Sequence, residues 1–160
     1  MTMTDTTDIE TLRRILRTAH RIAMVGLSDK WHRPSYFVAK YLLDRGFEVI
    51  PVNPGHQQIL GQKCYPTLED VPGKVDMVDL FQRPDRVMPF VESAIDMNVR
   101  FIWMQLGIVN EEAAAKARAQ GIEVVMDRCP KIEYARLFGG LNWVGVDTGI
   151  ISAKRPKYVN

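Results

Sequence analysis

Basic and small residues recur in this sequence where apolar segments end, and their shared chemistry is that of anion binding. The first such stretch reads Gly26-Leu27-Ser28-Asp29-Lys30-Trp31-His32-Arg33-Pro34-Ser35-Tyr36. The later ones are Asn53-Pro54-Gly55, Gln82-Arg83-Pro84, Gln105-Leu106-Gly107 and Asp127-Arg128-Cys129-Pro130. Glycine lets a backbone approach a ligand closely, and arginine and lysine supply the positive charge that a phosphate or carboxylate needs. If the fold brings these stretches together, they predict a site for an anionic ligand.

The first stretch also contains the predicted start of a helix, near residues 34–36. Proline is favoured in a first helical turn, and the free backbone N–H groups of that turn attract anions with the help of the helix dipole. Lys30 and Arg33 would add charge to such a site. The alternative is a plain connection with Arg33 on a solvated rim, since every helix start has free N–H groups. The sequence leaves both interpretations open.

Apolar runs alternate with segments of helical periodicity, and this alternation predicts how the stretches are positioned. Strands are expected at residues 22–26, 47–52, 75–81, 101–104 and 122–126, and helices at about 7–19, before Gly46, from Pro89 and at 111–120. Thr7 and Glu10 have the spacing of a capping box for the first helix. Such alternation predicts an α/β, Rossmann-like, three-layer fold with a parallel sheet of about five strands. Ligands bind beyond the carboxyl ends of such strands, where all five stretches lie.

One domain is expected to span residues 1–160, with an extended tail over residues 139–160. The tail contains Trp143 and is expected to wrap the domain or to reach a second subunit of a homodimer. Asp76 and Asp79 interrupt the third strand, and we interpret them as a strand end and one hydrogen-bonded polar position. Trp103 is expected in the core.

Bulk properties indicate a protein of the cytoplasm. The chain has 160 residues and a net charge of +2, which gives no reason to expect nucleic acid or a membrane as a partner. Its start lacks a secretory pattern, and no apolar run reaches the length of a membrane span. Cys64 and Cys129 are too few for a disulfide framework.

The sequence lacks the residues that several common cofactor and catalytic sites require. Gly26 stands without the Gly-x-Gly-x-x-Gly pattern, and the second strand ends in Val52-Asn53-Pro54 without a carboxylate for a ribose, so NAD is disfavoured. No phosphate-binding Gly-x-x-x-x-Gly-Lys-Ser/Thr loop is present. The three histidines lack metal-ligand spacing, and Ser28 and Ser35 are better interpreted as loop or cap residues than as nucleophiles.

Cys129 has two interpretations. It follows a strand and lies beside Arg128, and a neighbouring cation favours the reactive thiolate, which would allow a mixed disulfide with a thiol ligand. Most free cysteines are instead small buried hydrophobic residues, and this base rate favours the second interpretation.

Taken together in order, the motifs of residues 22–134 resemble those of the small stand-alone CoA-binding-domain proteins, which are related to the nucleotide-binding domain of the succinyl-CoA synthetase alpha subunit. The motifs are Val25-Gly26-Leu27-Ser28, Arg33-Pro34-Ser35-Tyr36, Ile50-Pro51-Val52-Asn53-Pro54, Val78-Asp79-Leu80-Phe81-Gln82-Arg83-Pro84, Trp103-Met104-Gln105-Leu106-Gly107 and Val125-Met126-Asp127-Arg128-Cys129. The tail segment Asn142-Trp143-Val144-Gly145 is similar to longer members. Gln82, where the family often has arginine, and His32 depart from the pattern.

The resemblance implies that coenzyme A binds across the loops after the strands. The residues that it assigns to the phosphate side are Gly26, Ser28, Arg33, Pro34, Ser35 and Tyr36, with Leu27 and Lys30 in the same loop. Asn53 and Pro54 would flank the nucleotide; Phe81, Arg83 and Pro84, beside Gln82, would contact the adenosine part; Gln105 and Gly107 would close the crevice. Arg128 and Cys129 complete the expected set.

Three functions remain for comparison. The leading one is a module that binds coenzyme A or an acyl-CoA without catalytic machinery and without a metal. A small CoA-dependent enzyme would have to use Cys129, and an NAD(P)-binding regulatory protein would have to place Arg83 on a 2′-phosphate.

Overall fold

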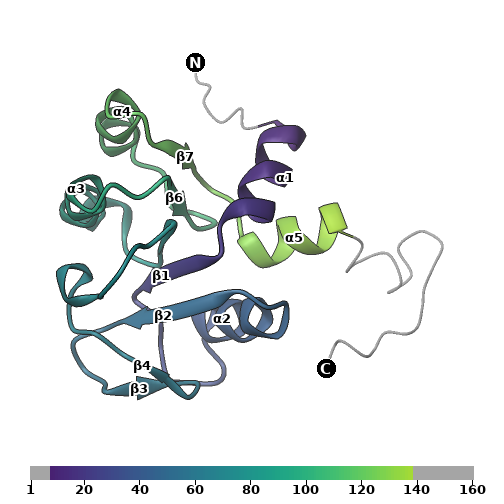
Figure 1. Cartoon of the computed structure of the whole chain (residues 1–160), viewed down its shortest axis with the longest axis vertical. Coiled ribbons are helices and arrows are strands. Elements are labelled where there is room, and N and C mark those ends of the chain that lie inside the picture. Colours follow the sequence, from purple (N-terminus) through teal and green to yellow (C-terminus); the bar gives the residue numbers. More distant parts are fainter. Residues whose placement is uncertain (1–7, 139–160) are drawn as a thin grey trace.

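The computed structural model describes residues 8–138 and contains a parallel sheet of five strands (Figure 1). The strands are β1 (Arg21–Val25), β2 (Glu48–Val52), β5 (Met77–Leu80), β6 (Phe101–Met104) and β7 (Glu123–Val125). Their order across the sheet is β2-β1-β5-β6-β7, and each neighbouring pair is parallel. The predicted α/β, Rossmann-like fold is therefore confirmed. The predicted tail, with Trp143, lies outside the described residues.

Helices cover both faces of the sheet. On one side lie α1 (Ile9–Thr18), α2 (Pro34–Asp44) and α5 (Pro130–Phe138), and on the other lie α3 (Met88–Asp96) and α4 (Glu111–Ala119) (Figure 1). Successive residues of a strand point to opposite faces, so Ile22 and Met24 of β1 pack in the core under the first group, while Ala23 and Val25 pack under the second. Both faces are buried, which explains why the strands read as apolar runs and not as alternating ones.

The first helix begins differently from the prediction. Its N-cap is Asp8, whose Oδ1 accepts a hydrogen bond of 2.8 Å from the backbone N–H of Thr11. Thr7, the expected N-cap, lies outside the described residues. Aspartate and threonine can both cap a helix, so the Thr7–Glu10 spacing is by itself a poor guide to which residue does so.

Two elements were not expected from the sequence. The hairpin of β3 (Gln58–Ile59) and β4 (Gln62–Lys63) has strands of two residues, too short for a periodic signal. Helix α5 buries Glu133 on its inner side, and a charged residue at a core position obscures the apolar pattern that predicts a helix. Two short 3-10 turns, η1 (Leu68–Asp70) and η2 (Pro84–Arg86), complete the described part, and the second lies directly before α3.

The two aspartates of the third strand segment behave differently from each other. Asp76 accepts hydrogen bonds from the backbone N–H groups of His20 and Arg21, at 3.0 and 2.9 Å, as a strand-end residue does. Asp79 is fully buried in β5, and neither of its carboxyl oxygens has a hydrogen-bond partner among the described residues. The prediction that it is hydrogen-bonded was therefore wrong. Burial raises the pKa of Asp79 well above its ordinary value, which favours the neutral acid.

Trp103 is in the core, as predicted, and has no exposed surface. Its indole Nε1 donates a hydrogen bond of 2.7 Å to the backbone carbonyl of Arg128. This bond satisfies the one polar atom of the side chain and ties the end of β6 to the segment after β7.

The strand order creates a point at which the chain leaves the sheet in opposite directions. After β1 it passes into α2 and on to β2, while after β5 it passes into α3, on the other face, and on to β6. The loop after β1 and the loop after β5 therefore diverge from each other. In sheets of this order the gap between them is where ligands bind.

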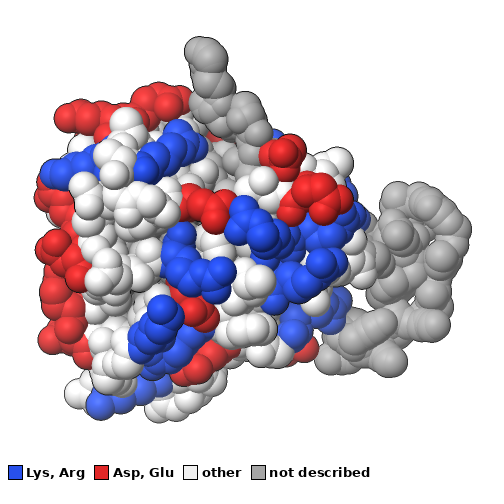
Figure 2. All heavy atoms as spheres, turned by 45° about the horizontal axis from the view of Figure 1, so that its top comes forward, with Lys and Arg blue, Asp and Glu red and all other residues white. Residues whose placement is uncertain are grey.

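The small net charge conceals an uneven surface. Figure 2 shows Lys and Arg side chains gathered over the centre and right of one face, with Asp and Glu along its left margin. Local fields, not the total of +2, therefore decide how a charged ligand approaches. Among residues 8–138 no helix has the length and apolar character that a membrane span requires.

We expect Asp79→Asn to change how stability depends on pH. Because burial raises the pKa of Asp79 in the folded state, the folded chain keeps a proton that the unfolded chain loses above about pH 4. The stability that this proton contributes is complete below that pH and is lost as the pH rises toward the folded-state pKa. Asparagine has a similar shape and does not titrate.

Urea unfolding at a series of pH values measures the effect. The free energy of unfolding of the wild type should fall relative to that of Asp79→Asn between pH 4 and pH 7, by up to about 1.4 kcal/mol per pH unit. Parallel pH profiles for the two proteins would show that Asp79 titrates normally.

Candidate functional site

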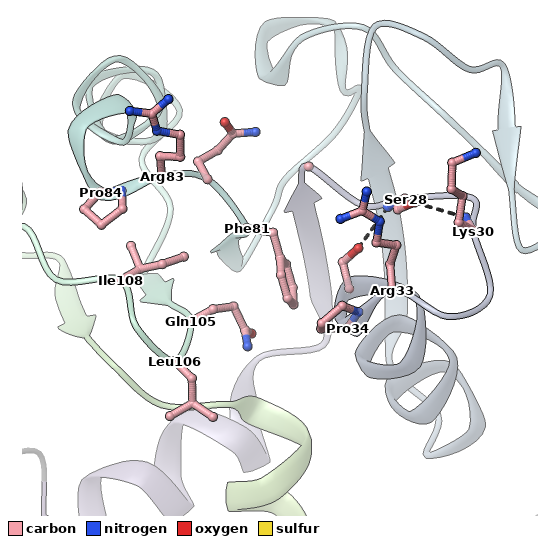
Figure 3. A pocket seen from close by; sticks show the side chains of 13 residues that line it. Ser28, Lys30, Arg33, Pro34, Phe81, Arg83, Pro84, Gln105, Leu106 and Ile108 are labelled. Atoms are coloured by element: carbon pink, nitrogen blue, oxygen red, sulfur yellow. Dashed lines mark hydrogen bonds between the residues drawn. The ribbon is translucent and has the colours of Figure 1, made fainter.

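A crevice of about 600 Å³ lies at the carboxyl ends of β1 and β5, at the point where their loops part (Figure 3). It gathers residues from the β1–α2 loop, from the segment after β5 and from the segment after β6. Its lining residues are Gly26, Ser28, Lys30, Arg33, Pro34, Ser35, Phe81, Gln82, Arg83, Pro84, Gln105, Leu106 and Ile108.

Gly26 marks the place where the two walls of the crevice meet. Its φ is +88°, and a Cβ atom at this position would lie 2.3 Å from the backbone carbonyl oxygen of Phe81. Its N–H donates a hydrogen bond of 3.0 Å to the carbonyl of Val52 in β2. Both the left-handed conformation and the close approach of a neighbouring backbone exclude a side chain here.

The β1–α2 loop is held to the start of its helix by two serine hydroxyls, which accept hydrogen bonds within the loop and do not cap α2. The backbone N–H of Ser28 donates to Ser35 Oγ at 3.0 Å, and the N–H of Lys30 donates to Ser28 Oγ at 3.0 Å (Figure 3). The N–H of Arg33 donates to the carbonyl of Lys30 at 3.0 Å and closes a turn. The loop is therefore ordered by its own bonds.

The N-terminus of α2 opens onto the crevice without a cap. Its N-cap residue, Arg33, makes no capping hydrogen bond with its side chain, the next residue is Pro34, and the first turn contains no acidic residue. Pro34 and Ser35 line the crevice. The positive end of the helix dipole is thus left for a ligand to neutralise.

The charge of the crevice is positive. Lys30, Arg33 and Arg83 line it, and no aspartate or glutamate does. Arg83 pairs with the exposed Asp85 at 3.1 Å, an ion pair that solvent screens. Lys30 and Arg33 have no ion-pair partner within residues 8–138, so their charge is available to an anion.

The opposite wall combines apolar surface with the polar side chains of Gln82, Arg83 and Gln105. Phe81 stands between the two groups of residues, and Leu106 and Ile108 follow β6 (Figure 3). Gln105 is buried, and its side-chain carbonyl Oε1 has no hydrogen-bond partner among the described residues. A buried acceptor left unpaired costs free energy, which a ligand N–H group can recover.

The remaining predicted site residues lie outside the crevice lining. They are Leu27, Tyr36, Asn53, Pro54, Gly107, Arg128 and Cys129. Leu27 is a core residue. Asn53 holds two loops together, because its Nδ2 donates to the Leu27 carbonyl at 2.9 Å and its Oδ1 accepts from the Gly55 N–H at 2.8 Å. Pro54 lines a separate hollow beside the β3–β4 hairpin.

The residues after β7 also have other neighbours. Arg128 lies 3.6 Å from Glu133 of α5, and Cys129 is buried with the core residues beneath α1 and α2 at the start of α5. The structure thus places Cys129 where a small hydrophobic residue belongs. The N–H of Gly107 donates to Asp127 Oδ1 at 2.7 Å, so Gly107 positions the loop that carries Leu106.

Leu106 and Ile108 are the lining residues that were not among the predicted ligand contacts, although Leu106 lies in a stretch expected at the site. Leu106 is 57% exposed and follows Gln105, the first residue after β6. Neither side chain has the charge or hydrogen-bonding groups by which residues for an anionic ligand were chosen.

With this geometry established, the comparison with known families is decisive. A model of the CoA binding domain matches residues 20–135, which include the crevice and all five strands. The chain belongs to this family. The resemblance inferred from the motifs is therefore confirmed.

Similarity to individual proteins supports the assignment to this family. The chain is 38% identical over 124 residues to the uncharacterized protein YneT of Bacillus subtilis, covering 78% of this chain and 92% of that protein. A hypothetical protein from Pyrococcus horikoshii has a solved structure with a TM-score of 0.82 and 42% identity, covering 87% of this chain and all of that one. An ADP-forming acetate–CoA ligase of Archaeoglobus fulgidus is 35% identical over 72 residues, 44% of this chain and only 10% of the ligase.

Gly26→Ala is expected to destabilise the fold more than an alanine at a glycine with the same backbone conformation. Gly121→Ala is the matched control, because Gly121 has a φ of +83° and nothing within 4 Å of the added methyl group. The control should lose about 1–2 kcal/mol of unfolding free energy from its conformation alone. Gly26→Ala should lose about 1–3 kcal/mol more, because the methyl group meets the Phe81 carbonyl.

Urea denaturation of both variants at neutral pH measures the two losses. Equal losses would mean that the contact between Gly26 and the Phe81 carbonyl is not close in solution.

Proposed function

We propose that this chain binds coenzyme A or an acyl-CoA in the crevice between the loops after β1 and β5. The observation that carries the proposal is the uncapped N-terminus of α2, lined with Lys30 and Arg33 and without any carboxylate. This is the environment that a diphosphate needs. Membership of the CoA-binding-domain family and the similarity to part of an acetate–CoA ligase support the choice of coenzyme A among phosphate-bearing ligands.

The rest of the crevice fits the other half of the ligand. The pantetheine arm of coenzyme A is largely apolar and carries two amide N–H groups. Phe81, Leu106 and Ile108 offer it apolar surface, and the unpaired Oε1 of Gln105 offers an acceptor for one amide. Arg83 adds positive charge from the wall opposite Arg33.

We propose a binding role and not a catalytic one. No histidine, cysteine, aspartate or glutamate lines the crevice, so its described wall offers no Ser–His or Cys–His pair, and the hydroxyls of Ser28 and Ser35 accept hydrogen bonds from the loop backbone. The CoA-dependent enzyme considered above would need Cys129, which is buried among core residues away from the lining. An NAD(P)-binding role is weaker, because β2 leads into Asn53 with no carboxylate for the ribose.

Titration calorimetry with coenzyme A, acetyl-CoA, NAD and NADP compares the candidates directly. We expect heat of binding from coenzyme A or acetyl-CoA and none from the two dinucleotides at the same concentrations. Tight binding of NAD or NADP without binding of either CoA form would contradict the proposal.

Arg33→Ala should weaken binding of coenzyme A roughly ten- to hundred-fold, because it removes a charge-assisted bond worth about 1.5–3 kcal/mol. Arg13→Ala on α1 is the control. It removes the same charge from a surface pair with Glu10, neither of which lines the crevice, and should leave the affinity unchanged.

Calorimetry gives both affinities, and thermal unfolding shows that both variants remain folded. An Arg33→Ala variant with wild-type affinity would place Arg33 on a solvated rim, outside the binding site.

A further inference from the structure

The turn formed by residues 30–33 carries two aromatic residues, Trp31 and His32, between two residues that line the crevice. The hydrogen bond from the Arg33 N–H to the Lys30 carbonyl closes it, so Trp31 and His32 occupy its two central positions. Both end residues, Lys30 and Arg33, line the crevice. The indole of Trp31 meets the imidazole of His32 edge to face, with ring centroids 5.7 Å apart.

Trp31 is unusually exposed for its size. Its exposed fraction is 70%, higher than that of Leu106 at 57% or Phe37 at 49%. Leaving a large apolar side chain in water forgoes the free energy of burying it. The turn is nevertheless held in place, because its backbone bonds to Ser28 and, through Ser28, to Ser35 of α2. An ordered loop therefore presents an uncovered indole beside two unpaired cations.

We propose that Trp31 stacks on the purine base of the bound nucleotide and that His32 supports its ring from the edge. This inference rests on the proposed function and deepens it. Phosphates bound by Lys30 and Arg33 would leave the attached nucleoside at the rim, next to the ring that lies between these two residues in sequence. The ligand class is thus a nucleotide whose base adjoins its phosphates, and not a pantetheine phosphate alone.

This assignment moves the adenosine from the wall of Phe81 and Pro84, where the family resemblance implied it, to the outer end of the crevice. The apolar wall of Phe81, Leu106 and Ile108 and the buried acceptor of Gln105 then remain for the pantetheine arm. Both halves of the ligand meet a surface of matching polarity.

Binding measurements on three ligands separate the base from the rest of the molecule. The probes are coenzyme A, adenosine 3′,5′-bisphosphate and 4′-phosphopantetheine, titrated into the wild type, Trp31→Ala and Trp31→Phe. Stacking of one base on an aromatic ring is worth about 1–3 kcal/mol, which corresponds to a roughly 5- to 150-fold change in affinity. Trp31→Ala should lose this factor for the two adenine ligands and keep the wild-type affinity for 4′-phosphopantetheine, while Trp31→Phe should recover most of the loss.

Phe37→Ala is the matched control, because it removes another exposed aromatic ring, on α2, that does not line the crevice. It should bind all three ligands as the wild type does. Fluorescence gives an independent readout: coenzyme A should quench the exposed indole of Trp31, and this quenching should disappear in Trp31→Phe, in which Trp103 and Trp143 remain.

Wild-type affinity of Trp31→Ala for coenzyme A would overturn the inference while leaving the proposed function intact. An equal loss for all three ligands would also overturn it, because Trp31 would then act by shaping the loop. Failure of the wild type to bind coenzyme A would contradict the proposed function itself, and this inference with it.

Discussion

The approach of Gly26 to the carbonyl of Phe81 is the contact on which the site depends. It joins the ends of two neighbouring parallel strands, β1 and β5, at a distance that admits no side chain. Immediately beyond it the chain turns to opposite faces of the sheet, into α2 on one side and toward α3 on the other. The crevice is the space that this divergence leaves, and both residues of the contact line it. A parallel sheet with this strand order thus makes a binding site from backbone geometry before any side chain is chosen.

Hydrogen bonds between side chains and neighbouring backbones then fix the loops around that space. Ser35 holds the β1–α2 loop, Asn53 joins the loops after β1 and β2, and Asp127 joins those after β6 and β7. Each bond satisfies a backbone group that a loop would otherwise leave to water. The loops are therefore ordered before a ligand binds, which reduces the conformational entropy that they lose on binding. Free charge is kept for the crevice, where Lys30 and Arg33 have no partner among the described residues.

The sequence alone predicts the sheet and its helices well, because buried parallel strands are apolar throughout and differ plainly from helices with one apolar face. It also predicts the loops that form the site, since the carboxyl ends of parallel strands share one edge. Which residue of a loop points into the crevice is harder to predict. Asn53 and Gly107 have suitable chemistry, yet they bind neighbouring loops, while Leu106 lacks a charged or hydrogen-bonding side chain and lines the crevice.

Charged residues at buried positions are the second feature that is hard to predict from the sequence. Glu133 hides the inner face of α5, and Asp79 lies in β5 without the hydrogen bond that burial of a polar group usually implies. Neither pattern follows from periodicity, since both place a charged residue where an apolar one is the norm. Tertiary contacts decide such positions, and only the folded arrangement reveals them.

The central claim is that the ligand lies in the crevice between the β1 and β5 loops. A titration of the ¹⁵N-labelled protein with coenzyme A, followed by backbone amide chemical shifts, tests it most directly. The account predicts that shifts move at residues 26–36, 81–83 and 105–108 and remain still along α1 and α5. Shifts confined to the opposite end of the sheet, around Phe47 and Tyr134, would contradict it.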